Sequence, residues 1–115
     1  LEVIRRHPSA PTVHLASLDD APTGDVLVST IPATAQSERL VEAAAGAALV
    51  FEALYDPWPT PLAAAAAARG QALVGGLDLL VHQAAQQFDL FTGRSAPLAV
   101  MRAAGESALA ARARP

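Results

Sequence analysis

Hydrophobic and polar positions along the chain fall into two patterns, short β-rich runs and longer stretches with helical spacing. The runs at residues 25–31 (DVLVSTI), 48–54 (ALVFEAL) and 72–74 (ALV) predict strands. The near-continuous apolar character of the first two is typical of strands that are buried on both faces of a sheet. The stretches that follow these runs predict helices at about residues 35–45, 61–69, 78–91 and 96–110.

Proline, threonine and glycine mark the borders of the second predicted helix. Pro57 and Pro59 make the segment before it non-helical, because each removes a backbone donor and restricts the preceding residue. Thr60 followed by Pro61 suits an N-cap and a first helical position. Gly70 suits the end of the same helix.

The first two dozen residues carry weaker patterns. Residues 1–6 predict a short strand or the end of one, and residues 13–18 predict a second short extended piece. Residues 19–24 have the Asp, Pro and Gly content of a loop.

Three predicted strands alternate with helices and two helices close the chain, which is the order of a parallel α/β sheet with crossover helices. We therefore expect an α/β fold with a partial doubly wound parallel sheet, the second half of a Rossmann-like domain, followed by C-terminal helices. Phe88 and Phe91 lie at helical spacing from Ala84, and we expect them in the core.

Composition argues against several classes of function. The net charge is −3 and no basic stripe is present, which argues against binding to nucleic acid. The absence of Cys (Cys 0) fits a cytoplasmic location, and His7, His14 and His82 lack the spacing of metal ligands. No charge-free apolar run has the length of a membrane span. Because the sequence begins with Leu1 instead of Met, we expect it to be part of a longer protein.

Three blocks in the chain carry a family resemblance. They are DVLVSTIPA at residues 25–33, YDPWPTPL at 55–62, and GLDLLVHQAAQQFDLFTG at 76–93. Their order and spacing resemble those of the shikimate dehydrogenase family. In this family a substrate domain precedes an NADP-binding domain, and the reaction is reversible hydride transfer between NADPH and 3-dehydroshikimate. The resemblance implies that residues 1–93 are the C-terminal half of the NADP-binding domain. It also implies that residues 94–115 form a closing helix and tail that return to the substrate domain.

The resemblance assigns substrate contacts to Tyr55 and Gln83. The Tyr55 hydroxyl would face the substrate from the edge of the cleft, and the Gln83 amide would hydrogen-bond a substrate hydroxyl. An amide suits a polyol because it both donates and accepts hydrogen bonds. Trp58 either packs under the Pro-rich loop or faces the same cleft.

The resemblance also implies cofactor contacts for NADP. Gly76 would let the nicotinamide approach the backbone, and Leu79 takes the place of the family's Met beside that ring. Thr30 and Ile31 lie where the family's strand end meets the cofactor, and Ser29 replaces the usual Asn. Ligands bind at the carboxyl ends of parallel strands, so these segments should lie at one edge of the sheet.

The family's catalytic machinery is not found in these residues. Its proton donor is a Lys–Asp pair, and all 8 basic residues of this chain are Arg. None of the 7 glycines forms the Gly-x-Gly loop that holds a dinucleotide phosphate. We therefore expect no catalytic residue and no activity in this part of the protein by itself.

Two alternatives stay open at this point. One is a quinate/shikimate dehydrogenase that uses NAD. The other is a non-catalytic α/β remnant that acts as an assembly module, since a partial sheet exposes an edge and apolar helix faces that favour self-association.

Overall fold

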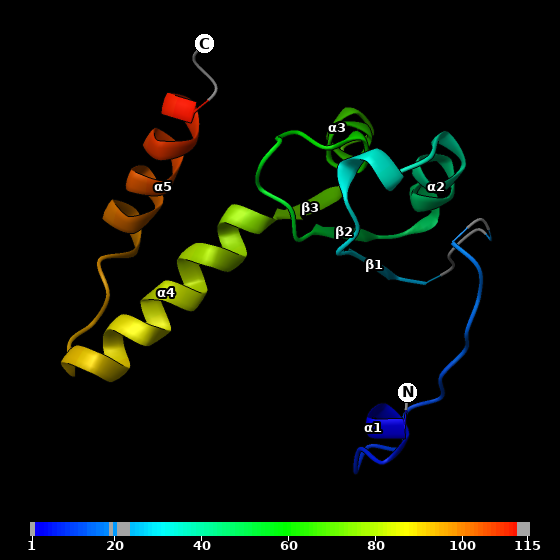
Figure 1. Cartoon of the computed structure of the whole chain (residues 1–115), viewed down its shortest axis with the longest axis horizontal. Coiled ribbons are helices and arrows are strands. Elements are labelled where there is room, and N and C mark those ends of the chain that lie inside the picture. Colours follow the sequence, from blue (N-terminus) through cyan, green and yellow to red (C-terminus); the bar gives the residue numbers. More distant parts are fainter. Residues whose placement is uncertain (1, 19, 21–23, 113–115) are drawn as a thin grey trace.

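The computed structural model describes residues 2–18, 20 and 24–112 of the chain, and Figure 1 shows how its elements are arranged. Strands and helices alternate, as the hydrophobic pattern predicts. The strands are β1 (Val26–Ser29), β2 (Leu49–Glu52) and β3 (Ala72–Gly75). The helices are α1 (Glu2–Arg5), α2 (Glu38–Ala43), α3 (Pro61–Ala68), α4 (Gly76–Thr92) and α5 (Leu98–Arg112), with 3-10 turns at Ala33–Ala35 and Ala44–Gly46.

The three strands form one parallel sheet in the order β1-β2-β3. The pairing register places Ser29 opposite Glu52, and Glu52 opposite Gly75. Each of these residues is the last of its strand, so the carboxyl ends of all three strands lie in one row. The expected α/β fold with a parallel sheet and C-terminal helices is confirmed.

Local signals in the sequence determine where the helices start and stop. The Thr60 hydroxyl accepts a hydrogen bond from the Ala63 N–H at 3.2 Å, and Pro61 is the first residue of α3. Gly70 has a φ of +67°, which favours glycine, and follows directly after the C-cap of this helix. The predicted cap, first position and stop of α3 are confirmed.

The core lies on one face of the sheet, under α2 and α3 (Figure 1). Leu40, Ala44 and Leu62 form its central cluster, and Leu27 of β1 packs against them. The opposite face of β1 is open, with Val28 56% exposed. The expectation that this strand is buried on both faces is therefore wrong for this chain, because no described element covers its second face.

The N-terminal segment also differs from the expectation. Residues 2–5 form one turn of helix instead of a strand, and residues 13–18 contain no strand. An extended segment becomes a strand only when a neighbour accepts and donates its backbone hydrogen bonds. Residues 19 and 21–23 of the predicted loop lie outside the described residues.

Helix α4 leaves the sheet and carries α5 with it, so the molecule is spread out instead of compact (Figure 1). The radius of gyration is 16.7 Å, whereas a compact domain of this length has about 13 Å. Phe91 near the far end of α4 is 85% exposed. Its expected place in the core is wrong, because the end of α4 projects beyond the sheet.

A buried carboxylate at the end of β2 joins three segments of the chain. The Glu52 side chain is fully buried and accepts three hydrogen bonds. Gln36 Nε2 donates at 2.6 Å, the Thr60 hydroxyl at 3.0 Å and the Leu54 N–H at 3.2 Å. These donors compensate the carboxylate for the loss of water, which burial otherwise makes costly.

Gln36 extends this network in both directions. Its amide oxygen accepts the Leu62 N–H at 3.0 Å, at the start of α3, and its amide nitrogen lies 3.4 Å from the Ser29 hydroxyl. The ends of β1 and β2 and the first turn of α3 are therefore fixed to one another by side-chain hydrogen bonds.

The network predicts that a nearly isosteric change at Glu52 lowers the stability of the fold substantially. Glu52→Gln places an amide NH₂ against at least one of the three donors. We expect it to lower the free energy of unfolding by about 1–3 kcal/mol, because a buried donor then loses its acceptor. Chemical denaturation of the chain measures this. Glu42→Gln, on the exposed surface of α2, is the matched control, and equal stability of the two variants would contradict the prediction.

Candidate functional site

The carboxyl edge of the sheet brings together the segments that the sequence singled out. Residues 30–31 follow β1, residues 55–58 follow β2, and residues 75–76 join β3 to α4. We call these three segments the rim. Because the three strands end in one row, the rim segments are neighbours in space although they are far apart in sequence.

Gly76 and the segment before Tyr55 are in direct contact. The Gly76 N–H donates to the Leu54 carbonyl at 3.3 Å. A Cβ on Gly76 would lie 2.1 Å from the Ala53 carbonyl oxygen, which is far inside van der Waals contact. Glycine at this position is therefore required by the chain's own backbone, and its predicted role toward a cofactor stays a prediction.

Two clefts open beside the rim. The larger, which we call the α5 cleft, has a volume of about 330 Å³. It is lined by Tyr55, Trp58, Gly75, Leu77, Asp78, Arg102, Glu106 and Leu109. The smaller, which we call the β1 cleft, has about 230 Å³ and includes Ser29, Thr30 and Ile31 in its lining. Of the predicted site residues, Tyr55 lines the α5 cleft, and Thr30 and Ile31 line the β1 cleft.

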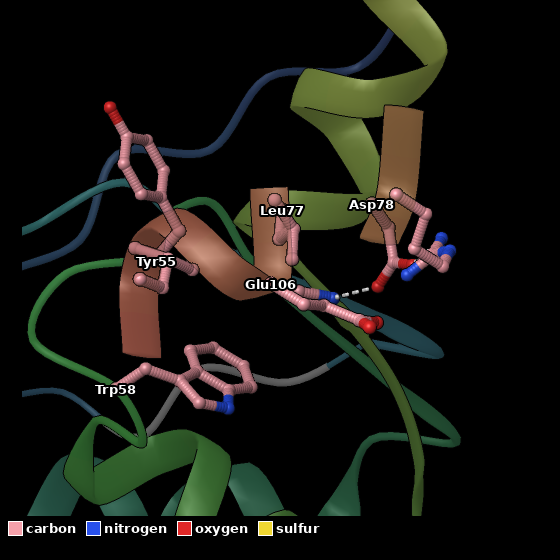
Figure 2. Close-up of a pocket in the computed structure, with 8 residues that line it drawn as sticks. Tyr55, Trp58, Leu77, Asp78 and Glu106 are labelled. Atoms are coloured by element: carbon pink, nitrogen blue, oxygen red, sulfur yellow. Dashed lines mark hydrogen bonds and ion pairs between the residues drawn. The ribbon is translucent and has the colours of Figure 1, made fainter. Parts of the chain in front are cut away.

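The aromatic residues of the α5 cleft have different orientations (Figure 2). Trp58 lies against the end of β3, where a Cβ on Gly75 would be 3.0 Å from its Cη2 atom. Of the two positions considered for Trp58, the structure therefore has the one that faces the cleft. Figure 2 shows the Tyr55 hydroxyl pointing away from Trp58 and Asp78.

The three predicted site residues on α4, Gly76, Leu79 and Gln83, line neither cleft. Leu79 is 45% exposed, and Gln83 is exposed without lining either hollow. Gln83 lies seven positions after Gly76, which corresponds to about 10 Å along the helix axis. The structure therefore brings Tyr55 and Gly76 together but leaves Gln83 and Leu79 on the surface, and the predicted ligand contacts of these residues are not tested by it.

Charged residues from α4 and α5 meet at one wall of the α5 cleft. Arg102 of α5 forms an ion pair with Asp78, whose other carboxylate oxygen accepts the Gly75 N–H at 3.0 Å. Burial alone would raise the pKa of Asp78. The hydrogen bonds from Arg102 and Gly75 and the positive charges of Arg102 and His82 outweigh burial and hold the pKa below its ordinary value.

The α5 wall of the site was not predicted from the sequence. An Asp in the first helical turn is a recognisable helix-start signal, so the sequence pattern could have identified Asp78 as a residue near the rim. Arg102 and Glu106 carry no local signal, because they meet the rim only through the packing of α5 on α4.

The described residues meet neither the requirements of a metal site nor those of a membrane-spanning helix. No three His, Asp or Glu side chains of residues 2–18, 20 and 24–112 are grouped in a way that could hold a metal ion. Within the same ranges no helix is long and apolar enough to cross a bilayer.

Comparison with known proteins gives the same family from sequence and from structure. A family profile described as "Shikimate 5'-dehydrogenase C-terminal domain" matches residues 76–104, which are α4 and the first half of α5. Shikimate dehydrogenase (NADP(+)) of Archaeoglobus fulgidus is 44% identical over 64 residues, 56% of this chain and 24% of that protein. Shikimate dehydrogenase (NADP(+)) of Synechococcus sp. strain JA-3-3Ab is 38% identical over 85 residues, 73% of this chain and 28% of that protein.

A solved structure extends this agreement to the fold. The crystal structure of Mycobacterium tuberculosis shikimate dehydrogenase superposes with a TM-score of 0.66 at 43% identity, over 73% of this chain and 32% of that one. The chain belongs to the shikimate dehydrogenase family. It matches the C-terminal part of this family and spans about a quarter of the two curated relatives described above.

The lowered pKa of Asp78 predicts how stability depends on pH in this member of the shikimate dehydrogenase family. A carboxyl group whose pKa is lowered by folding stabilises the fold above its ordinary pKa of 3.8, and this contribution is lost as the pH falls through the lower folded value. The difference in unfolding free energy between the natural chain and Asp78→Asn should therefore be constant near neutral pH and shrink below about pH 4.

Denaturation at a series of pH values measures this difference. Arg102→Gln is the control, because without the guanidinium the effect of Asp78→Asn near neutral pH should be smaller. A difference that stays constant from neutral pH down to the acid limit of folding would contradict the assignment.

Proposed function

We propose that this chain supplies the C-terminal half of the NADP-binding domain and the closing helices of a shikimate dehydrogenase, which interconverts 3-dehydroshikimate and shikimate with NADPH. The observation that carries the proposal is the contact between Gly76 and the segment before Tyr55 at the carboxyl edge of a parallel sheet. Ligands bind at this edge in open α/β sheets. The names of the curated relatives, Shikimate dehydrogenase (NADP(+)), support both the substrate and the cofactor.

The domain division is part of this proposal. Residues 1–93 would belong to the cofactor domain, and residues 94–115 would form the closing helix and tail. The boundary coincides with Gly93, which follows α4 with a φ of +65° and redirects the chain toward α5. A cytoplasmic location goes with this activity as a prediction.

The residues proposed to contact NADP suit only one end of the cofactor. Thr30, Ile31, Gly76 and Leu79 are all uncharged, which fits the neutral ring of a reduced nicotinamide better than it fits phosphates. The cofactor, when bound, supplies the hydride. The Gly-x-Gly loop would come from residues outside this chain, because its glycines form no such loop.

The residues proposed for the substrate bind and orient it without transferring a proton. Tyr55 is 38% exposed at the rim, and Gln83 on α4 is exposed to solvent. The chain has no Lys, so the family's Lys–Asp proton donor cannot lie within it. Proton donation to the carbonyl oxygen is therefore assigned to another part of the protein.

A chimaeric enzyme tests the function. This chain replaces the corresponding C-terminal segment of the Mycobacterium tuberculosis relative, and reduction of NADP⁺ by shikimate is measured. We expect activity in the chimaera and none in the isolated chain. Gln83→Ala should lower kcat/KM for shikimate by about 5- to 150-fold, the effect of losing a hydrogen bond worth roughly 1–3 kcal/mol.

Gln86→Ala is the matched control, because Gln86 lies on the same helix and is also exposed to solvent. A folded chimaera without activity would overturn the proposed function. An active chimaera in which Gln83→Ala and Gln86→Ala behave alike would overturn the substrate site but not the function.

A second candidate role is self-association through the open face of the sheet. Val26 and Val28 of β1 are 57% and 56% exposed, and β1 is also an edge strand whose outer side has no partner among the described residues. Exposed apolar edge strands pair readily with another chain. The same observation is expected if this face packs against a part of the protein outside this chain.

Sedimentation velocity of the isolated chain tests the second role. We expect a concentration-dependent dimer, and we expect Val28→Glu to shift it toward monomer because it places a charge on the open face. Val3→Glu, at an apolar position that is 84% exposed in α1, should leave the distribution unchanged. A monomer at all concentrations would rule this role out.

A further inference from the structure

Helix α5 is attached to the rest of the chain at three successive points. Arg102 pairs with Asp78 at the start of α4. One turn later, Gly105 packs against Leu77, where a Cβ would lie 2.8 Å from the Leu77 Cδ1 atom. Near its end, Arg112 Nη1 lies 3.6 Å from the Asp56 carboxylate.

The partners at these points belong to two different segments of the rim. Asp78 accepts the Gly75 N–H, so the pair with Arg102 connects α5 to the turn between β3 and α4. Asp56 follows directly after Tyr55, so the pair with Arg112 connects α5 to the loop after β2. Helix α5 therefore reaches from one segment to the other along the wall of the α5 cleft, and its Glu106 also lines this cleft (Figure 2).

We propose that Arg102 and Asp78 are positioning residues: through them, α5 fixes the loop of residues 55–58 relative to the turn at residues 75–76 and so sets the width of the α5 cleft. The effect of this positioning on catalysis rests on the proposed function, in which Tyr55 contacts the substrate and Gly76 contacts the cofactor. Neither Arg102 nor Asp78 needs to touch a ligand for this role.

Close packing between α5 and α4 explains why a partly exposed ion pair is enough to position α5. The side chains of Arg102 and Asp78 are 39% and 36% exposed, and such a pair holds two elements only weakly by itself. Gly105 lets the backbone of α5 approach Leu77 directly, so the ion pair only has to select the rotation of a helix that is already in contact.

Amide hydrogen exchange in the isolated chain, followed by NMR, tests the proposal. Two backbone amides report on the rim, because the Gly75 N–H donates to Asp78 and the Gly76 N–H donates to Leu54. We expect Arg102→Gln to speed exchange at both glycines by up to about fivefold, the change that corresponds to losing a pair of this exposure. Amides of α2 should keep their rates.

Arg102→Lys retains the charge, and we expect it to restore most of the protection. Arg94→Gln makes the same change of charge in the turn after α4, at an exposed side chain, and should have no effect at the rim. If Arg102→Gln prevents folding, Arg112→Gln carries the test at the second attachment point, with faster exchange at Gly76 as the expected result.

Faster exchange confined to α5, or an equal increase throughout the sheet, would overturn the proposal, because the rim would then not depend on Arg102 specifically. These measurements need no ligand. An inactive chimaera would therefore leave the proposed positioning role standing, and unchanged exchange at Gly75 and Gly76 would overturn it even if the chimaera were active.

Discussion

The buried carboxylate of Glu52 is the interaction on which the geometry of the site depends. It lies at the end of the central strand, and its hydrogen bonds reach the loop after β1 through Gln36 and the start of α3 through Thr60. A carboxylate without water is stable only when donors surround it, so these segments have little freedom to move apart. The loop that carries Tyr55 is consequently fixed at both of its ends, by Glu52 and by Thr60.

The second constraint is the presence of glycine at two positions where a helix backbone packs closely against a neighbouring element. Gly76 lets the start of α4 lie against the end of β2, and Gly105 lets α5 lie against Leu77. Both contacts place helices closer to the rim than any larger residue would allow. The α5 cleft is the space that remains between these closely packed elements, with Trp58 against the end of β3 and the Asp78–Arg102 pair at one wall.

The open surfaces of the molecule agree with its place in the shikimate dehydrogenase family. One face of β1 and the far end of α4 are uncovered, and the chain corresponds to about a quarter of the two curated relatives. Small chains bury a smaller fraction of their surface than larger domains do. Val28 and Phe91 are correspondingly exposed in this chain of 115 residues.

The sequence by itself determined the elements and their order, because strand periodicity, the Thr60–Pro61 helix start and the glycine stops act over a few residues. It also identified the segments around Tyr55 and Gly76 as neighbours, since parallel strands end at one edge. Only the tertiary structure decided which strand faces stay open, that residues 2–5 do not join the sheet, and that Arg102 meets Asp78 across 24 positions of sequence. These outcomes depend on which surfaces happen to pack against each other, and a local pattern contains no information about partners that lie far away along the chain.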